Sequence, residues 1–375
     1  MRTSVVLLFH LLAATSLAAA TGILNAGDRV EFTVHEWGTF TSIAGADGKA
    51  VEWLPLAGPV DLPSFVETIS DRIKGILAGT VRMETPVLYF YAPRETTVSV
   101  RVQFPRGTLT EWFPHAVVTP ANTMAWTDVR IAPRMPADFP RERGANHYYV
   151  ARQTDASPLQ VGQQKERFLF YRGVGRFAPP IAATISADGT ILVKATDGGA
   201  VGDVMLFENR KGAVGFQVHR VATDRITLDP SAADAESTSP GAQLEKMLVA
   251  RGLYPKEAAA MVGTWRDSWF EQGTRLFYVV SQETVDSILP LEIRPAPGNV
   301  TRVFVGRMEL VTAATKQEVK DAIAGHDKAT LAQYARFLGP IADRILADSA
   351  PADRARLERA VTTCLASINP AGGCN

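Results

Sequence analysis

Residues 30–42, VEFTVHEWGTFTS, predict the first strand of the fold. Valine and phenylalanine alternate with polar residues along this stretch, which is the period-two pattern of a half-buried strand. If the alternation continues, Glu36 points to the apolar side, whereas His35 and Trp37 share the opposite face. A carboxylate that faces a core must be paired, hydrogen-bonded, protonated or placed at a cleft. Glu36 is therefore the first candidate for a functional residue.

The N-terminus has the features of a secretory signal peptide, residues 1–20. Arg2 precedes a short apolar run, and Ala18-Ala19-Ala20 supplies a small-residue cleavage site. The apolar run is too short for a membrane-spanning helix, and no later stretch approaches the length that a span needs. We therefore expect a soluble mature protein, periplasmic or secreted, without a membrane span.

The charge balance argues against a nucleic-acid partner, because 39 basic residues stand against 39 acidic ones. A small-molecule or carbohydrate ligand is the expected partner instead. The two cysteines, Cys364 and Cys374, can pair in an oxidising compartment, and a disulfide between them would pin the C-terminus. No CxxC or CxxCH motif supports a redox dithiol or an attached haem, and we expect no cofactor.

The residue pattern predicts a mainly β protein, an antiparallel β-sandwich or open barrel, followed by a smaller C-terminal mixed α/β or α+β domain. Short alternating segments separated by turns such as Asp188-Gly189 are typical of a sandwich. After about residue 240 the period becomes helical. The expected segments are a first β-sheet region 27–118, a Pro/Arg-rich loop 119–165, a second β region 166–228 that completes the same sandwich or builds another, a linker 229–240, and a helix-rich domain 241–375 with a small sheet.

A glutamate precedes three of the six tryptophans, in the pairs Glu36-Trp37, Glu52-Trp53 and Glu111-Trp112. Adjacent side chains on a strand face opposite ways, so one member of each pair faces outward. One interpretation buries the tryptophans in the core and leaves the glutamates in water. The other exposes Trp37, Trp53 and Trp112 as binding surfaces that stack on sugar rings.

Glu111 shares the anomaly of Glu36, because it also falls among apolar positions of its strand. Two desolvated carboxylates close together would have split pKa values, which is what general acid–base catalysis on a glycosidic bond requires. The sequence does not place them near each other, and an arginine could neutralise either one. An extracytoplasmic hydrolase with this acid pair is thus the alternative to a binding function.

A metal-dependent hydrolase that uses His35 and its neighbours is a variant of that alternative. The histidines of the β-rich part, however, lack the spacing of metal ligands, and no metal site is assigned. The Pro/Arg-rich loop is the expected ligand surface, because long segments without periodicity are usually functional or mobile. Its candidate binding residues are Arg141, Arg143 and His147.

Residues 35–42, HEWGTFTS, together with 82–91 and 252–270, resemble predicted secreted bacterial proteins of uncharacterised function. The resemblance is spread over most of the mature chain and implies bacterial export, without implying an activity. Residues and resemblance together predict an exported, β-rich ligand-binding or structural module, with the hydrolase as the alternative. Whether the protein is an enzyme stays open at this point.

Overall fold

A computed structural model describes residues 31–56, 61–120, 122–230 and 239–368. Its central element is a nine-stranded sheet in which the opening stretch of the sequence forms an inner strand. In sheet order the strands are β14 (Ala213–Val221), β13 (Gly202–Arg210), β16 (Gly273–Val280), β18 (Asn299–Leu310), β1 (Thr33–Ile43), β3 (Val81–Tyr91), β10 (Leu169–Gly175), β5 (Gly107–Phe113) and β2 (Glu67–Thr68). The β1–β18 pair is parallel, and the other pairs of this sheet are antiparallel.

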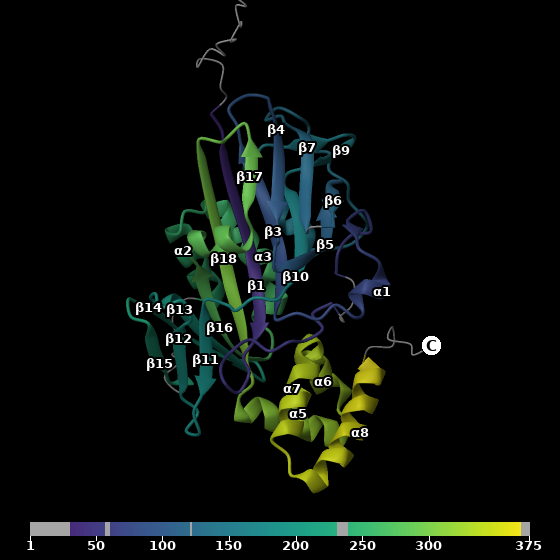
Figure 1. Cartoon of the computed structure of the whole chain (residues 1–375), viewed down its shortest axis with the longest axis vertical. Helices are drawn as coiled ribbons and strands as arrows, with labels where there is room; N and C mark the ends of the chain where they lie inside the picture. Colours follow the sequence, from purple (N-terminus) through teal and green to yellow (C-terminus); the bar gives the residue numbers. More distant parts are fainter. Residues whose placement is uncertain (1–30, 57–60, 121, 231–238, 369–375) are drawn as a thin grey trace, which may run out of the picture. The chain divides into compact units, whose positions relative to one another are not determined.

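Two smaller sheets pack on one face of the nine-stranded sheet (Figure 1). On β4, Val98, Val100 and Val102 are buried while Ser99 and Arg101 are exposed, so this strand has one wet face as its alternation predicts. The six-stranded sheet comprises β17 (Leu291–Arg294), β4 (Thr96–Gln103), β7 (Thr123–Ile131), β8 (Leu159–Val161), β9 (Gln164–Glu166) and β6 (Val117–Thr119); the three-stranded sheet comprises β11 (Ile181–Ile185), β12 (Ile191–Ala195) and β15 (Arg225–Leu228).

Helices cover the other face of the nine-stranded sheet, where a second core forms. They are α2 (Pro240–Ala250), α3 (Pro255–Trp269) and the short 3₁₀ helix η2 (His147–Arg152). Ser239 caps α2, because its hydroxyl accepts a hydrogen bond from the Ala242 N–H, and Pro240 fits the first helical position. The inner strands of the central sheet are consequently buried on both faces.

The C-terminal helices build a third core against the end of the parallel β1–β18 pair. Ile43 and Val311, which lie at or just beyond the ends of these strands, contribute to it. The helices are α5 (Ala313–Gly325), α6 (Lys328–Gln333), η4 (Ala335–Phe337), α7 (Leu338–Ala347) and α8 (Pro351–Ile368), and two short helices elsewhere are α1 (Asp71–Lys74) and α4 (Gln282–Ile288).

The predicted fold class is confirmed, since the protein is mainly β with packed sheets and a helical C-terminal region. The prediction that 241–375 forms a domain of its own is wrong. β16 and β18 lie in the middle of the main sheet, beside β1, and residues from Glu31 onward form one compact unit. Alternation shows which residues share a face of a strand, but it does not show which strands pair. The second β region adds β10, β13 and β14 to the same sheet.

The Pro/Arg-rich segment 119–165 is also more regular than predicted. It contains β7, an inner strand of the six-stranded sheet, as well as β8 and η2. Irregular chain runs mainly from residue 132 to 146. The aromatic run that begins at His147 forms the 3₁₀ helix η2, and the side chain of Asn146 caps it by accepting from the Tyr148 N–H.

Three predictions fall on residues outside the described ranges: the signal peptide 1–20, most of the linker 229–240, and Cys374. Cys364 belongs to α8, and its pairing stays a prediction. Within the described ranges, no helix combines the length and the apolar character needed to cross a membrane.

Candidate functional site

Glu36 points into the core between the sheets, as the alternation predicted. It is fully buried, and its Oε2 accepts a hydrogen bond from the Nε of Arg302 at 2.5 Å. The hydroxyl of Tyr171 donates to Oε1 of the same carboxylate. Burial, followed by the Glu36 charge, raises the pKa of Tyr171 well above its ordinary value, so this hydroxyl remains a donor. The carboxylate on the apolar face is therefore paired and hydrogen-bonded.

Its neighbours His35 and Trp37 share the opposite face, which is covered by helices and not by solvent. The Nδ1 of His35 lies 2.7 Å from Oε2 of Glu257 on α3, and Tyr254 stacks on the imidazole at 4.4 Å. Trp37 is fully buried in the second core. The two residues thus attach α3 to β1, and the predicted role of Trp37 in ligand binding is wrong.

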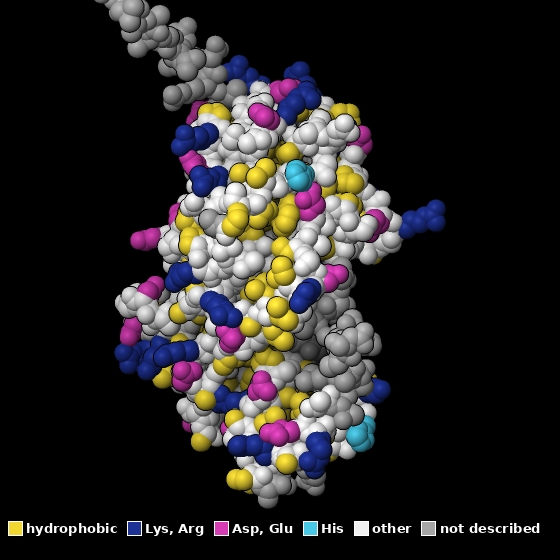
Figure 2. Space-filling view, turned by 45° about the vertical axis from the view of Figure 1, so that its right-hand side comes forward, with side chains coloured by type: hydrophobic (Ala, Val, Ile, Leu, Met, Phe, Trp, Pro, Cys, Tyr) yellow, Lys and Arg dark blue, Asp and Glu magenta, His cyan; other side chains and the backbone are white. Residues whose placement is uncertain are grey.

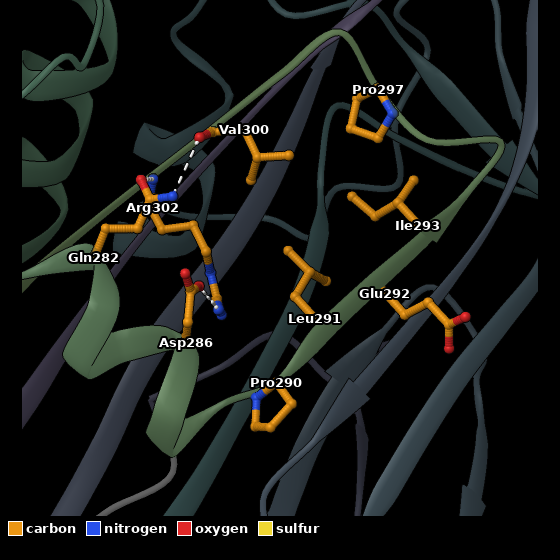
Figure 3. A pocket seen from close by; sticks show the side chains of 9 residues that line it. All are labelled: Gln282, Asp286, Pro290, Leu291, Glu292, Ile293, Pro297, Val300 and Arg302. Atoms are coloured by element: carbon orange, nitrogen blue, oxygen red, sulfur yellow. Dashed lines mark hydrogen bonds and ion pairs between the residues drawn. The ribbon is translucent and has the colours of Figure 1, made fainter.

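Arg302 connects Glu36 to a surface pocket of about 570 Å³. One continuous stretch of chain forms this pocket, from α4 through β17 to the beginning of β18. Figure 3 shows Asp286 and Arg302 on one side and Leu291 and Ile293 of β17 on the other. We call it the Arg302 pocket, and it is lined by Gln282, Asp286, Pro290, Leu291, Glu292, Ile293, Pro297, Val300 and Arg302.

The Arg302 guanidinium is held rigidly and still has one free donor nitrogen. Nη1 donates to Oδ1 of Asp286 and to the Leu289 carbonyl, each at 2.7 Å. Nη2 is buried and has no hydrogen-bond partner among the described residues. Burial alone would lower the pKa of Arg302, but Glu36 outweighs burial and raises it, so the guanidinium stays charged. Arg302 therefore places a fixed cation in the pocket wall, and its buried Nη2 is a donor without a partner among the described residues.

The local sequence explains how α4 presents its polar face to the pocket. Ser281 caps the helix by accepting from the Thr284 N–H at 3.2 Å, and the next residue, Gln282, is one turn before Asp286. Both polar side chains line the pocket, whereas Val285 is buried on the other side of the helix. Sequence reasoning missed this site because Asp286 and Arg302 match no motif.

Glu111 lies on the face of the sheet opposite to Glu36, so the predicted acid pair is wrong. A register shift between β5 and β10 aligns Glu111 with Arg172 and Leu109 with Gly173, which leaves Thr110 as an extra residue. A one-residue slip reverses the faces of a strand, and Glu111 consequently points away from the core that contains Leu109.

The environment of Glu111 holds it as a structural anion. Burial would raise its pKa, but Arg172, Thr110 and Lys74 outweigh burial and lower it. The Lys74 ammonium lies 2.9 Å from its Oε1. A carboxylate kept ionised in this way does not serve as the protonated acid that the glycosidase hypothesis needs.

His147 is the one loop candidate that approaches Glu111, through a shared arginine. Arg172 is the register partner of Glu111 on β10. Its Nη1 donates to Asp61 at 2.8 Å, and its Nη2 lies 3.4 Å from Nε2 of His147. His147 also stacks on Trp265 at 5.6 Å. Burial, then the charge of Arg172, lowers the pKa of His147 and favours the neutral imidazole.

The other predicted binding residues do not meet. Trp53 packs on Phe337 in the third core, and Trp112 is half-buried with its Nε1 donating to Glu67 at 2.8 Å. Arg141 and Arg143 are exposed, and Arg141 lies over the ring of Tyr149. All six tryptophans are described and none is exposed, so the predicted sugar-stacking surface is wrong.

The surface charge is mixed, with acidic and basic side chains interspersed over the face shown in Figure 2. Within the described part of the chain, no group of three or more His, Cys, Asp or Glu side chains could hold a metal ion. His35, the residue proposed for the metal-dependent variant, is instead bonded to Glu257.

Comparison with known proteins gives no family. No protein-family model matches the chain, and no curated protein matches it. Among solved structures, it is similar to the yeast delta-COP-I mu-homology domain, alone and complexed with a Dsl1 WxWxV peptide. Each match has 7% sequence identity and a TM-score of 0.28. It covers 74% of this chain and 96% of the yeast domain's chain. A similarity this weak carries no argument about function.

Proposed function

We propose that the protein binds a small organic acid in the Arg302 pocket, with the carboxylate on Arg302 and an apolar body against β17. The observation that carries this proposal is the fixed Arg302 guanidinium, which lines the pocket and whose buried Nη2 has no hydrogen-bond partner among the described residues. A buried donor without an acceptor costs free energy, and a carboxylate oxygen that arrives with a ligand removes that cost. Charge-assisted hydrogen bonds from arginine to carboxylates are among the strongest in proteins.

The lining supports a ligand with one charged end. Opposite Arg302, the chain offers Leu291, Ile293 and Pro297, which are apolar. The volume of about 570 Å³ lies in the range of pockets that enclose small organic ligands. Asp286 and Glu292 add negative charge at the pocket, and this disfavours a second carboxylate on the ligand.

What supports binding over hydrolysis is the state of the nearby carboxylates. Glu36 is occupied by Arg302 and Tyr171, and it lies behind the arginine as a buried counter-ion. Asp286 accepts from Nη1 of the same arginine. Neither group is placed as a free acid or base next to a second one, and both orient the guanidinium that receives the ligand.

Calorimetry with octanoate and with octan-1-ol, two probes of equal chain length, tests the proposal. Octanoate should bind far more tightly than the alcohol, because only the carboxylate brings a negative charge to the guanidinium. Leu291→Trp should abolish octanoate binding by filling the pocket without removing a charge. Glu292→Gln should tighten binding several-fold, since the pocket then loses a negative charge that takes no part in holding Arg302.

Val214→Trp provides the matched control, because Val214 is exposed on β14 and does not line the pocket. This variant should bind octanoate as the unmodified protein does. Equal binding of octanoate and octan-1-ol, or full octanoate binding by a folded Leu291→Trp protein, would contradict the proposal. Folding of each variant is checked by circular dichroism.

A further inference from the structure

A second group of arginines lies on the helix-covered side of the nine-stranded sheet, away from the Arg302 pocket. Arg82 on β3 and Arg307 on β18 point to this side, because their neighbours Met83 and Met308 belong to the core on the opposite side. Arg336 reaches the same place from η4 among the C-terminal helices. We call these three residues the arginine cluster.

Two glutamates connect the arginine cluster. Oε1 of Glu84 accepts from Nη1 of Arg336 at 2.8 Å and lies 3.4 Å from Nε of Arg82. Oε1 of Glu271 accepts from Nη2 of Arg307 at 2.7 Å and lies 3.7 Å from Nη2 of Arg336. Glu271 thus contacts both Arg307 and Arg336. The guanidinium of each arginine lies 4.9 Å from the ring centre of Phe337.

Two further carboxylates lie near the cluster, and each accepts its closest hydrogen bond from an arginine outside it. Asp61, whose charge acts on Arg82 and Arg336, accepts from Nη1 of Arg172 at 2.8 Å. Glu309 lies 3.4 Å from Nη2 of Arg307, but it accepts its closer hydrogen bond from Nε of Arg275 at 3.0 Å. Arg275 is itself fully engaged, since its other nitrogens donate to carbonyls and to Glu309. With Glu309 paired to Arg275 and Asp61 paired to Arg172, three guanidiniums face the two carboxylates of Glu84 and Glu271.

The cluster also has more hydrogen-bond donors than acceptors. Nε and Nη1 of Arg307 are buried and lack a partner among the described residues, and Arg307 is 0% exposed. Nε of Arg82 and Nη2 of Arg336 also make no hydrogen bond, although each lies within ion-pair distance of a glutamate. Thr39 on β1 adds an unpartnered hydroxyl on the same face. The cluster thus combines a surplus of donors with a surplus of positive charge.

Backbone irregularities border the cluster. Residue Thr85, next to Glu84, has a φ of 50°, which is strained for a β-branched residue. The register of β3 shifts there against both β1 and β10. Bulges and strained residues of this kind concentrate at functional sites, because they turn side chains out of the regular alternation.

We infer that the arginine cluster is a binding site for a tetrahedral oxyanion, phosphate or sulfate, free or as the terminal group of a larger molecule. The planar forks of Arg307 and Arg336 suit several oxygens on one centre, and the anion restores the charge balance. Burial, then Arg336 and Arg275, lowers the pKa of Arg307 to about 10. At Arg336, burial is outweighed by Glu84 and Glu271, and the pKa is raised.

Calorimetry and thermal unfolding of the full chain test the inference, with phosphate, sulfate, phenyl phosphate and chloride compared at equal ionic strength. Phosphate or sulfate should bind and raise the melting temperature, and chloride should not. Phenyl phosphate that binds more tightly than phosphate assigns the site to a phosphoryl group of a larger molecule; weaker binding assigns it to the free ion. Failure of both oxyanions to exceed chloride would overturn the inference.

Two substitutions of opposite sign separate an anion site from a merely structural network. Arg336→Gln should weaken oxyanion binding at least about tenfold, the loss of one charge-assisted hydrogen bond. Glu271→Gln removes a negative charge and should strengthen oxyanion binding, even though it destabilises the protein without the anion. A role confined to stability would lower both melting temperatures and leave oxyanion affinity unchanged, which contradicts the inference.

Arg130→Gln is the matched control, because Arg130 forms an exposed ion pair with Glu95. It should leave oxyanion binding unchanged. Leu291→Trp should also leave it unchanged, so this site and the Arg302 pocket succeed or fail separately. If Arg336→Gln does not fold, Glu271→Gln alone tests the inference. Unchanged or weaker oxyanion binding by this variant overturns the inference.

Discussion

Glu36 and Arg302 are direct partners in the parallel β1–β18 pair, and their side chains meet in the core with Nε and Oε2 2.5 Å apart. This ion pair is buried, with side-chain exposures of 0% and 1%. It joins the first described strand of the chain to a strand near the C-terminus, and it fixes the guanidinium that lines the pocket. The stability of the sheet and the geometry of the Arg302 pocket therefore depend on the same contact.

Removing the Glu36 charge should destabilise the protein strongly. Glu36→Ala leaves the Arg302 charge poorly compensated in the core, and we expect a loss of about 3–5 kcal/mol in the free energy of unfolding. Urea unfolding followed by circular dichroism measures it. Glu95→Ala breaks an exposed, solvent-screened pair with Arg130 and should cost far less. Equal losses in the two variants would show that Glu36 is not a needed counter-ion.

Glu84 should make stability depend on pH in the acid range. Burial raises its pKa, but Arg336 and Arg82 outweigh burial and lower it from 4.5 to about 2. A carboxylate with a lowered pKa stabilises the fold above its unfolded-state pKa, and this contribution disappears as the pH falls from about 4.5 to about 2. At 1.36 kcal/mol per pH unit, the loss is about 3 kcal/mol.

Urea unfolding between pH 7 and pH 2 checks this prediction. Glu84→Gln should be less stable than the unmodified protein at pH 7, and the difference should shrink as the pH falls through this window. Two parallel curves over the whole range would count against it. Glu95→Gln serves as the surface control and should follow the unmodified protein closely, because its carboxylate is exposed.

Gly306 should not tolerate alanine, because the Tyr278 ring lies directly over it. A Cβ at Gly306 would be 1.9 Å from Cζ of Tyr278, a buried residue that is a register partner on the neighbouring strand. We expect Gly306→Ala to destabilise by about 1–3 kcal/mol through overpacking. Gly325→Ala is the control, since a Cβ there meets nothing within 4 Å in α5, and it should stabilise by up to about 1 kcal/mol. Thermal unfolding distinguishes the two signs.

Cys364 and Cys374 should form a disulfide when the protein is made in an oxidising compartment. Intact mass spectrometry without reductant should give a mass two hydrogens below the fully reduced value. In the chain-entropy model, so short a loop stabilises by about 3 kcal/mol, and reduction should lower the melting temperature. Two thiols that react with an alkylating reagent in the non-reduced protein would refute the pairing.

The residue pattern predicted single strands well, but it did not predict which strands pair with one another. It predicted β1, the buried position of Glu36 and the need of that carboxylate for a partner. It failed at Glu111, because a bulge at Thr110 reversed the face of the strand, and a bulge leaves little trace in the hydrophobic alternation. The Trp37 ring was predicted on the correct face, but the helices that bury that face come from residues 240–269.

The sequence by itself determined that this is a β-rich protein whose opening strand carries a glutamate, Glu36, on its apolar face. Alternation and side-chain polarity are local properties, so they can be read from a short stretch. Only the tertiary structure decided what that carboxylate does. Arg302 is 266 residues away from Glu36 in the chain, and parallel pairing of β1 with β18 brings the two together. Strand pairing of this kind depends on the summed packing of whole sheets, and no short stretch encodes it. The pocket beside Arg302 and the arginine cluster on the other face both arise at that level.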